Sequence, residues 1–450
     1  MAHILSIPIE VRLTILFALG CCIGAVINLG IYRLAWYPRA ISPWSQQNPD
    51  SPPRQFWDRL PVIGWLGLRR EAKLHGAGFW IRPLSVELLT GAVFALLYWW
   101  EVVRFGLVPK NLLTPEGVLS LAAIRHEQFI AHGILFCFML AAFWIDIDEM
   151  TIPDGVTIPG TLAGLILITL WPYALLPETP QNSNGPFGVP MLTSVWLISP
   201  AEAPSPPNNL TDPRYLNPWE LPACTGRVAL AAAIAAFCAW CLALVPGRWY
   251  TRHGYLRAIK VFTARMVRER MTNALLALAV LGAVVITIIW WMGGIHWAGL
   301  ESSLAGIVIG GGLVWLIRIV GTALMGQEAM GFGDVTLLAM IGAFLGWQAA
   351  VIVFFLAPLF AVTYGVARLM LRGEKEIPFG PFLCLGVVAT VLCWWYIPVL
   401  DWPGLWERGY PIFRLGWMLI PLLFVCLMLM VVLLPPVRWI VARLRRLRGC

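Results

Sequence analysis

The chain has 450 residues, of which 59% are hydrophobic and only 12% are charged. This composition is too apolar for a soluble protein of this length and indicates a chain that lies in a lipid bilayer. The net charge of +8 does not indicate nucleic-acid binding, because the basic residues gather in short segments between apolar stretches, where membrane orientation explains them.

Apolar stretches of membrane-spanning length recur from one end of the chain to the other. A helix needs about 20 mostly apolar residues to cross the hydrocarbon core, and the first stretch is too long for the core of a signal peptide. We therefore expect an all-α fold, a polytopic transmembrane helical bundle with about 8–11 crossings. The short stretch 335–347 could instead be a tilted helix or a re-entrant segment. The predicted spans are 12–33, 84–101, 129–147, 156–176, 228–246, 273–293, 297–320, 335–347, 348–371, 379–397 and 414–435.

The distribution of basic residues predicts which segments face the cytoplasm. Segments 34–83 and 247–271 and the C-terminal tail are rich in arginine and lysine, whereas 177–227 has only Arg214 and Arg227. Because cytoplasmic loops carry an excess of basic residues, we expect the first three inside and 177–227 outside. The outer segment is rich in Pro, Asn and Ser, so we interpret it as an insertion with little regular structure.

Acidic residues gather in two clusters at predicted span ends, where an ionisable group needs a partner, water or a function. Both clusters fall on the predicted cytoplasmic side. Two carboxyls brought together from different helices cannot easily both ionise, so one keeps a proton and the pair can act as acid and base in peptide hydrolysis. The first cluster is Asp146, Asp148, Glu149 and Asp154, and the second is Glu328 and Asp334.

Each of these acids also has a purely structural explanation. Asp334 could be the N-cap of the next helix, Asp154 could cap the helix that follows it, and Asp146 could end a span at the water. Gly331 and Gly333 would allow a tight backbone turn and the close approach of a substrate strand beside the acid. The occurrence of two acidic clusters on one side, each followed by an apolar helix, favours a catalytic pair.

Two motifs resemble those of a known family. The string D-x-x-x-x-x-I-P-D runs from Asp146 to Asp154, and the string G-F-G-D runs from Gly331 to Asp334. In order and spacing they resemble the two active-site motifs of the type IV prepilin leader peptidases, once 177–227 is treated as an insertion. Further blocks similar to family segments lie at 20–34, 60–70, 83–91 and 376–386.

The resemblance implies a membrane aspartic endopeptidase that removes the short basic leader from type IV prepilin-like subunits, either pilins or pseudopilins. It places the active site at the cytoplasmic face of a bacterial-type inner membrane, with Asp146 and Asp334 as the catalytic pair. The implied partners are the prepilin substrate and the lipid bilayer, with no nucleic acid. Supporting roles fall to the other motif residues, Asp148, Pro153, Asp154, Gly331 and Gly333.

The chain also departs from the family pattern. Members that methylate the new amino terminus usually carry two Cys-x-x-Cys pairs in the first cytoplasmic loop, and segment 34–83 contains no cysteine. We therefore expect no metal, no cofactor for proteolysis, and S-adenosylmethionine only if N-methyltransferase activity is retained. Cys238 and Cys241 have ligand spacing, but with no second pair or histidine close in sequence we interpret them as packing residues. Thr336 stands where the family often has lysine.

We expect one integral membrane peptidase domain over 1–450. Within it, 34–83 is the cytoplasmic loop, 130–397 is the peptidase core with both Asp motifs, and 177–227 is the outer insertion. Two alternatives stay open, namely a protease for other membrane helices and a non-catalytic membrane transporter or secretion-system scaffold. A transporter predicts acids in the middle of spans, whereas these acids fall at predicted span ends.

Overall fold

The computed structural model describes residues 7–37, 41–44, 52–107, 117–176, 226–245, 270–325, 328, 330–371 and 378–394. Regular structure in these ranges is helical, without strands, which confirms the all-α prediction. Three predicted features lie outside the described residues, in whole or nearly so: the outer insertion 177–227, the basic segment 247–271 and the last span 414–435.

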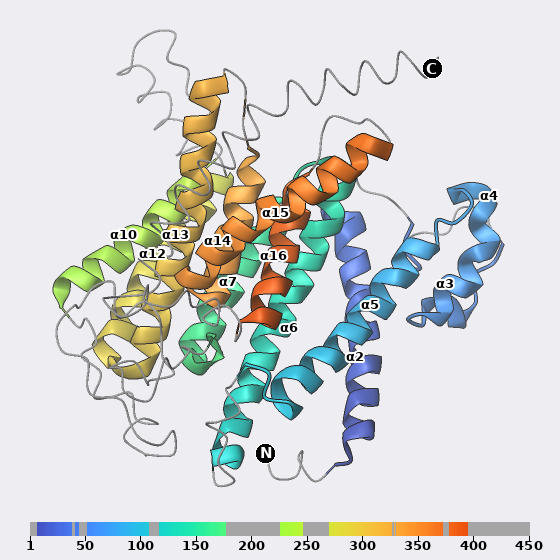
Figure 1. The fold of residues 1–450 in the computed structure, drawn as a ribbon, viewed down its shortest axis with the longest axis horizontal. Helices are drawn as coiled ribbons and strands as arrows, with labels where there is room; N and C mark the ends of the chain where they lie inside the picture. Colours follow the sequence, from blue (N-terminus) through green and yellow to red (C-terminus); the bar gives the residue numbers. More distant parts are fainter. Residues whose placement is uncertain are drawn as a thin grey trace.

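Ten main helices in the described ranges correspond to the first ten predicted spans. Six are long and apolar enough to cross a membrane, with α5 extended by the π-helical turn η3 (Trp99–Val103), and four are shorter apolar helices. These lengths and compositions are those of an integral membrane protein. The ten are α2 (Ile9–Leu34), α5 (Ile81–Tyr98), α6 (Gly117–Glu149), α7 (Asp154–Leu170), α10 (Arg227–Ala243), α12 (Arg270–Met292), α13 (Gly294–Met325), α14 (Phe332–Leu345), α15 (Trp347–Leu371) and α16 (Gly380–Cys393) (Figure 1).

The helix ends near the two motifs differ by a residue or more from the predicted caps. Met150 follows α6 with a left-handed φ of 53°, which ends that helix. Pro153 is the N-cap of α7, so Asp154 is its first residue, where an acid favours the positive end of the helix dipole. Gly331 is the N-cap of α14, and Asp334 is the third residue of that helix. The prediction that either aspartate could be the N-cap is therefore wrong.

Helix α14 lies at the centre of the bundle. Every residue from Asp334 to Leu345 is buried, and the helix contacts α6, α7, α13, α15 and α16. Its 14 residues give a length of ~21 Å at about 1.5 Å per residue, shorter than the ~30 Å hydrocarbon core. The approach to α13 is close, because a β-carbon added at Gly306 would lie 2.0 Å from the carbonyl oxygen of Gly342. The two backbones therefore touch, as they do where small residues meet between membrane helices.

Helices α2 and α5 pack along each other and carry the loop between them. A β-carbon added at Gly20 of α2 would lie 2.7 Å from the Cα of Gly91 of α5, so these backbones touch as well. The loop contains the short helices α3 (Ile63–Leu68) and α4 (Ala72–His75), which stand at the side of the bundle beyond α5 (Figure 1). The amino-terminal unit, defined here as α2, this loop and α5, therefore lies beside the core that contains both Asp motifs.

Two buried carboxylates organise the described part of this loop. Arg54 donates hydrogen bonds of 2.9 Å and 3.0 Å to the two carboxylate oxygens of Glu71. Arg70 pairs with Asp58 through a single nitrogen, Nη2. Both carboxylates are only 2% exposed, and a buried charge without its partner would cost several kcal/mol. Ion pairs therefore hold residues 54–71 in one arrangement.

Candidate active site

Asp146 lies in the last turn of α6, and its side chain is buried. Its Oδ2 accepts a hydrogen bond of 3.0 Å from the backbone N–H of Gly380, the first residue of α16. A β-carbon added at Gly380 would lie 2.6 Å from that oxygen and 2.8 Å from Cδ1 of Ile152. Glycine is therefore needed at position 380, because any larger residue would displace the carboxyl group. The free N–H groups at the start of a helix also suit a carboxylate.

Asp334 lies in the first turn of α14 and is also buried. Its carboxyl group interacts with the backbone of Gly331, the N-cap of the helix. The third residue of a helix is the position from which a side chain can reach back to the cap. The carboxyl group of Asp334 therefore lies at the start of α14.

The two sequence motifs touch each other through Ile152. A β-carbon added at Gly333 would lie 2.8 Å from the Cβ of Ile152 and 3.1 Å from its backbone nitrogen and oxygen. Ile152 therefore packs against the first turn of α14 on one side and, through Gly380, against the first turn of α16 on the other. The ends of α6, α14 and α16 meet at this residue.

The meeting of these helix ends brings the two predicted aspartates together. The charges of Asp146 and Asp334 interact with each other, and both act on the buried thiol of Cys384, one turn into α16. The thiol itself points to the carbonyl oxygen of Met139, 3.6 Å away. The structure thus brings the two acids that the sequence paired into the same neighbourhood, while their roles stay a prediction and are taken up below.

Three of the four remaining predicted acids have other partners. Asp148 pairs with Arg82 of α5, and Glu149 accepts hydrogen bonds from backbone N–H groups just after α2. Asp154 is half-buried at the start of α7, with Pro153 before it as the cap. Glu328 is exposed and pairs with Arg318 of α13. None of these contacts places a third carboxyl group on the Asp146–Asp334 pair.

The two glycines of the second motif have different explanations from the predicted one. Gly331 has a φ of −67°, and neither it nor Gly333 is among the residues with positive φ. Neither position therefore uses the freedom of glycine to adopt positive φ. Close approach explains Gly333, but the neighbour is Ile152 of the other motif. A β-carbon at Gly331 would meet its nearest neighbour, Oδ2 of Asp334, at 3.5 Å, an ordinary contact. Thr336 donates a hydrogen bond of 3.0 Å to the carbonyl oxygen of Gly333, so it closes the first turn of α14.

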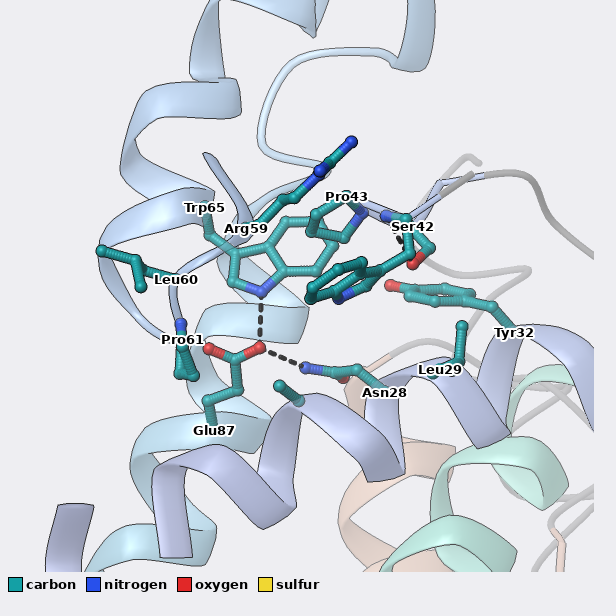
Figure 2. A pocket seen from close by; sticks show the side chains of 12 residues that line it. Asn28, Leu29, Tyr32, Ser42, Pro43, Arg59, Leu60, Pro61, Trp65 and Glu87 are labelled. Carbon is teal, nitrogen blue, oxygen red and sulfur yellow. Dashed lines mark hydrogen bonds between the residues drawn. The ribbon is translucent and has the colours of Figure 1, made fainter. Parts of the chain in front are cut away.

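A second, smaller site lies between α2, α5 and the loop (Figure 2). Its cavity measures about 10 Å³, enough for one water molecule. Glu87 is 1% exposed at this cavity, and its carboxylate accepts hydrogen bonds from Trp65 Nε1 at 2.7 Å, Asn28 Nδ2 at 3.3 Å and the backbone N–H of Val62. Glu87 therefore joins both helices to the loop.

Comparison of the sequence with known proteins places this chain in a family. A model described as "Type IV leader peptidase family" matches residues 133–194 and 262–366. A second, "Bacterial Peptidase A24 N-terminal domain", matches residues 18–101. Together the two models cover more than half of the chain. In the first of these models, the match over 133–194 contains Asp146 and Asp154, and the match over 262–366 contains Asp334.

Several relatives carry the name prepilin leader peptidase/N-methyltransferase. The protein from Aeromonas salmonicida (strain A449) is 38% identical over 109 residues, which cover 22% of this chain and 35% of the relative. The one from Pseudomonas aeruginosa is 34% identical over a match that covers 26% of this chain and 45% of the relative. The one from Myxococcus xanthus is 30% identical over a match that covers 34% of this chain and 39% of the relative. The chain thus matches less than half the length of these relatives.

No solved structure matches the chain. The family assignment therefore comes from the sequence models and the curated relatives, and the geometry of the aspartate pair agrees with it. Both matched models describe parts of one kind of protein, and they occur in this chain in the order of the two structural units, the amino-terminal unit and the core with both Asp motifs. The chain belongs to the type IV leader peptidase family.

Proposed function

We propose that this protein is a membrane aspartic endopeptidase that removes the short basic leader from type IV prepilin-like subunits, pilins or pseudopilins. The observation that carries the proposal is the buried pair of carboxyl groups at the ends of two helices, Asp146 of α6 and Asp334 of α14, whose charges interact. The names of the relatives support the substrate class.

The pair supplies an acid and a base at one place. Two close carboxyl groups share a single proton, so one is a carboxylate and the other a carboxylic acid. The carboxylate takes a proton from a water molecule as its oxygen attacks the scissile carbonyl, and the acid stabilises the oxyanion and then protonates the leaving amine. Gly380 N–H holds one oxygen of Asp146, so its other oxygen remains for the water.

The position of the acids along their helices favours this proposal over a transporter. Asp146 is the fourth residue from the end of α6, and Asp334 is the third residue of α14. Acids that couple ion movement are expected near the middle of the membrane, whereas a leader at the membrane surface is reached from helix ends. The alternative of a protease for other membrane helices uses the same pair and is separated from the proposal by substrate choice.

We further propose that the pair faces the cytoplasm from the inner membrane. The loop between α2 and α5 carries the basic residues that predict a cytoplasmic position, and Arg82 and Asp148 bring the start of α5 to the end of α6 that holds Asp146. The substrate leader, which is basic in this class, would approach from that side.

Methylation of the new amino terminus is a second activity in the names of the relatives. It would need S-adenosylmethionine, and the natural place is the region matched over 18–101. The cavity at Glu87 does not fit such a group, because it has room for one water molecule and three donors already occupy the carboxylate. We therefore assign no methyl-transfer step to these residues.

The proposal is tested with the purified protein in lipid nanodiscs and a prepilin-type substrate with a short basic leader, a Gly before the cut and an apolar helix. We expect one cut after that Gly, found by intact mass, and no cut in a substrate without the leader. Rates should fall on both sides of a pH optimum, because the two carboxyls titrate as a pair. They should not respond to a chelator or to a thiol-blocking reagent, since Cys384 is buried. If a chelator abolished cleavage and added zinc restored it, the protein would instead be a metalloprotease.

A further inference from the structure

The amino-terminal unit holds the last turn of α6 at two places. The first is Arg82, in the first turn of α5. Its guanidinium lies 4.6 Å from the ring centroid of Trp144 and donates hydrogen bonds to the carboxylate of Asp148 and, at 3.3 Å, to the carbonyl oxygen of Trp144. One side chain therefore contacts the residues two positions before and two positions after Asp146.

The second place is Glu149, the last residue of α6. Its carboxylate accepts hydrogen bonds of 2.6 Å from the backbone N–H of Trp36 and 3.0 Å from that of Tyr37. These two residues follow Ala35, the C-cap of α2. The chain segments on either side of the loop, one after α2 and one at the start of α5, thus both end on the turn that carries Asp146.

The contacts matter because a helix end frays unless something holds it. The last four carbonyl groups of a helix lack partners within it, and a cation near this end also interacts favourably with the helix dipole. Arg82 supplies the cation, and its planar guanidinium stacks on an aromatic ring while it binds a carboxylate, which a lysine cannot do equally well. Arg82 makes these contacts with Trp144 and Asp148, the near neighbours of Asp146 in the chain.

We propose that Arg82 is a positioning residue for the proposed peptidase reaction, which fixes Asp146 against Asp334 through its contacts with Trp144 and Asp148. The amino-terminal unit then contributes to proteolysis by holding the end of α6 in place. The proposal rests on the proposed function, because a position matters for the rate only if Asp146 takes part in the reaction.

The test compares Arg82→Ala, Arg82→Lys, Asp148→Asn and the double variant Arg82→Ala/Asp148→Asn in the nanodisc cleavage assay. We expect kcat to fall about 10-fold in Arg82→Ala, because small misplacements of reacting groups cost one to two orders of magnitude, while KM stays within about twofold. Lysine should restore part of kcat through its charge. The double variant should be no slower than the slower single variant, because both remove one contact.

Arg104→Ala is the matched control. Arg104 is exposed and also stacks on a tryptophan, with its Cζ 4.8 Å from the ring centroid of Trp99, but it lies after the other end of α5. This variant should keep the wild-type kcat. Thermal unfolding of all variants separates a local effect on the rate from loss of the fold.

Two results would overturn the proposal while leaving the proposed function intact. One is a wild-type kcat in Arg82→Ala. The other is a loss of kcat in Arg82→Ala and Asp148→Asn that multiplies in the double variant, which would show that the two residues act separately. Absence of cleavage by the wild-type protein would instead contradict the proposed function itself.

Discussion

The backbone of Gly380 and the carboxyl group of Asp146 lie so close together that no side chain fits at position 380 without displacing the carboxyl group. The hydrogen bond fixes one carboxylate oxygen, and the lack of a side chain at Gly380 leaves room for Ile152. The direction of the Asp146 carboxyl group is thus set by a residue of α16 and not by its own helix alone.

Replacement of Gly380 by alanine should therefore slow catalysis more than it harms the fold. The new methyl group would lie 2.6 Å from Oδ2 of Asp146, so the carboxyl group must move. We expect a kcat at least about 10-fold lower and a loss of stability of about 1–3 kcal/mol. Cleavage kinetics and thermal unfolding measure the two effects.

Gly133→Ala is the control for this variant. Gly133 lies in α6 itself, and an added β-carbon would meet its nearest neighbour, Cζ of Phe94, at 3.5 Å, which is ordinary contact. A rate near wild type is expected. If Gly380→Ala cleaved as fast as Gly133→Ala, the claimed contact with Asp146 would be wrong.

Sequence alone predicted the two aspartates as a pair but not the residue that holds one of them. Asp146 and Asp334 could be predicted because acids are rare in so apolar a chain and each lies next to an apolar helix. Gly380 is separated from Asp146 by 234 positions, and a glycine beside Pro381 reads as an ordinary helix start. The block at 376–386, which resembles a family segment, predicted that a helix starts there but did not predict that this helix contacts Asp146.

At the scale of elements, the core depends on helices that touch backbone to backbone. A β-carbon added at Gly306 of α13 would lie 2.0 Å from the carbonyl oxygen of Gly342 of α14, and one added at Gly342 would lie 2.1 Å from the carbonyl oxygen of Gly306. In membranes such contacts supply van der Waals packing where the hydrophobic effect between helices is absent. This contact sets the position of α14, and therefore of Asp334 at its first turn.

A methyl group at Gly306 should push α13 and α14 apart. Gly306→Ala is expected to lower the free energy of unfolding by about 1–3 kcal/mol and to reduce activity in parallel, because Asp334 moves with its helix. Gly312→Ala in the same helix meets nothing within 4 Å and should be neutral. Thermal unfolding of both variants tests this, and equal melting temperatures would contradict the packing described.

The helices themselves were predictable, and their ends less so. Length and apolar composition alone predicted ten helices within the described ranges. The caps depend on the local backbone, so Gly331 and Pro153 took the cap positions that sequence reasoning gave to the following aspartates. The partners of Asp148 and Glu149 could not be predicted, because they come from α5 and from the segment after α2, distant in the chain.

At the scale of the molecule, hydrolysis by the aspartate pair requires both acidic clusters on one side of the membrane. The end of α6 and the start of α14 meet at Ile152, so the two motifs cannot face opposite sides. We propose, from the basic segments, that this side faces the cytoplasm.

Membrane topology can be measured directly. Reporters placed near residues 60, 260 and 450 should read as cytoplasmic, and one near residue 200 as external, because basic loops stay inside. Labelling of the same positions in inverted vesicles provides an independent check. An external reading at 60 would reverse the proposed orientation of the active site.

The proposed hydrolysis depends on Asp146 and Asp334 acting together. Single-turnover cleavage of a prepilin-type substrate, followed by intact mass, should be at least about 1,000-fold slower in both Asp146→Asn and Asp334→Asn, because each removes half of the acid–base pair. The cleavage rate of Asp154→Asn should fall far less, and all three variants should unfold at the wild-type temperature. Cleavage at the wild-type rate in either Asp146→Asn or Asp334→Asn would contradict the account.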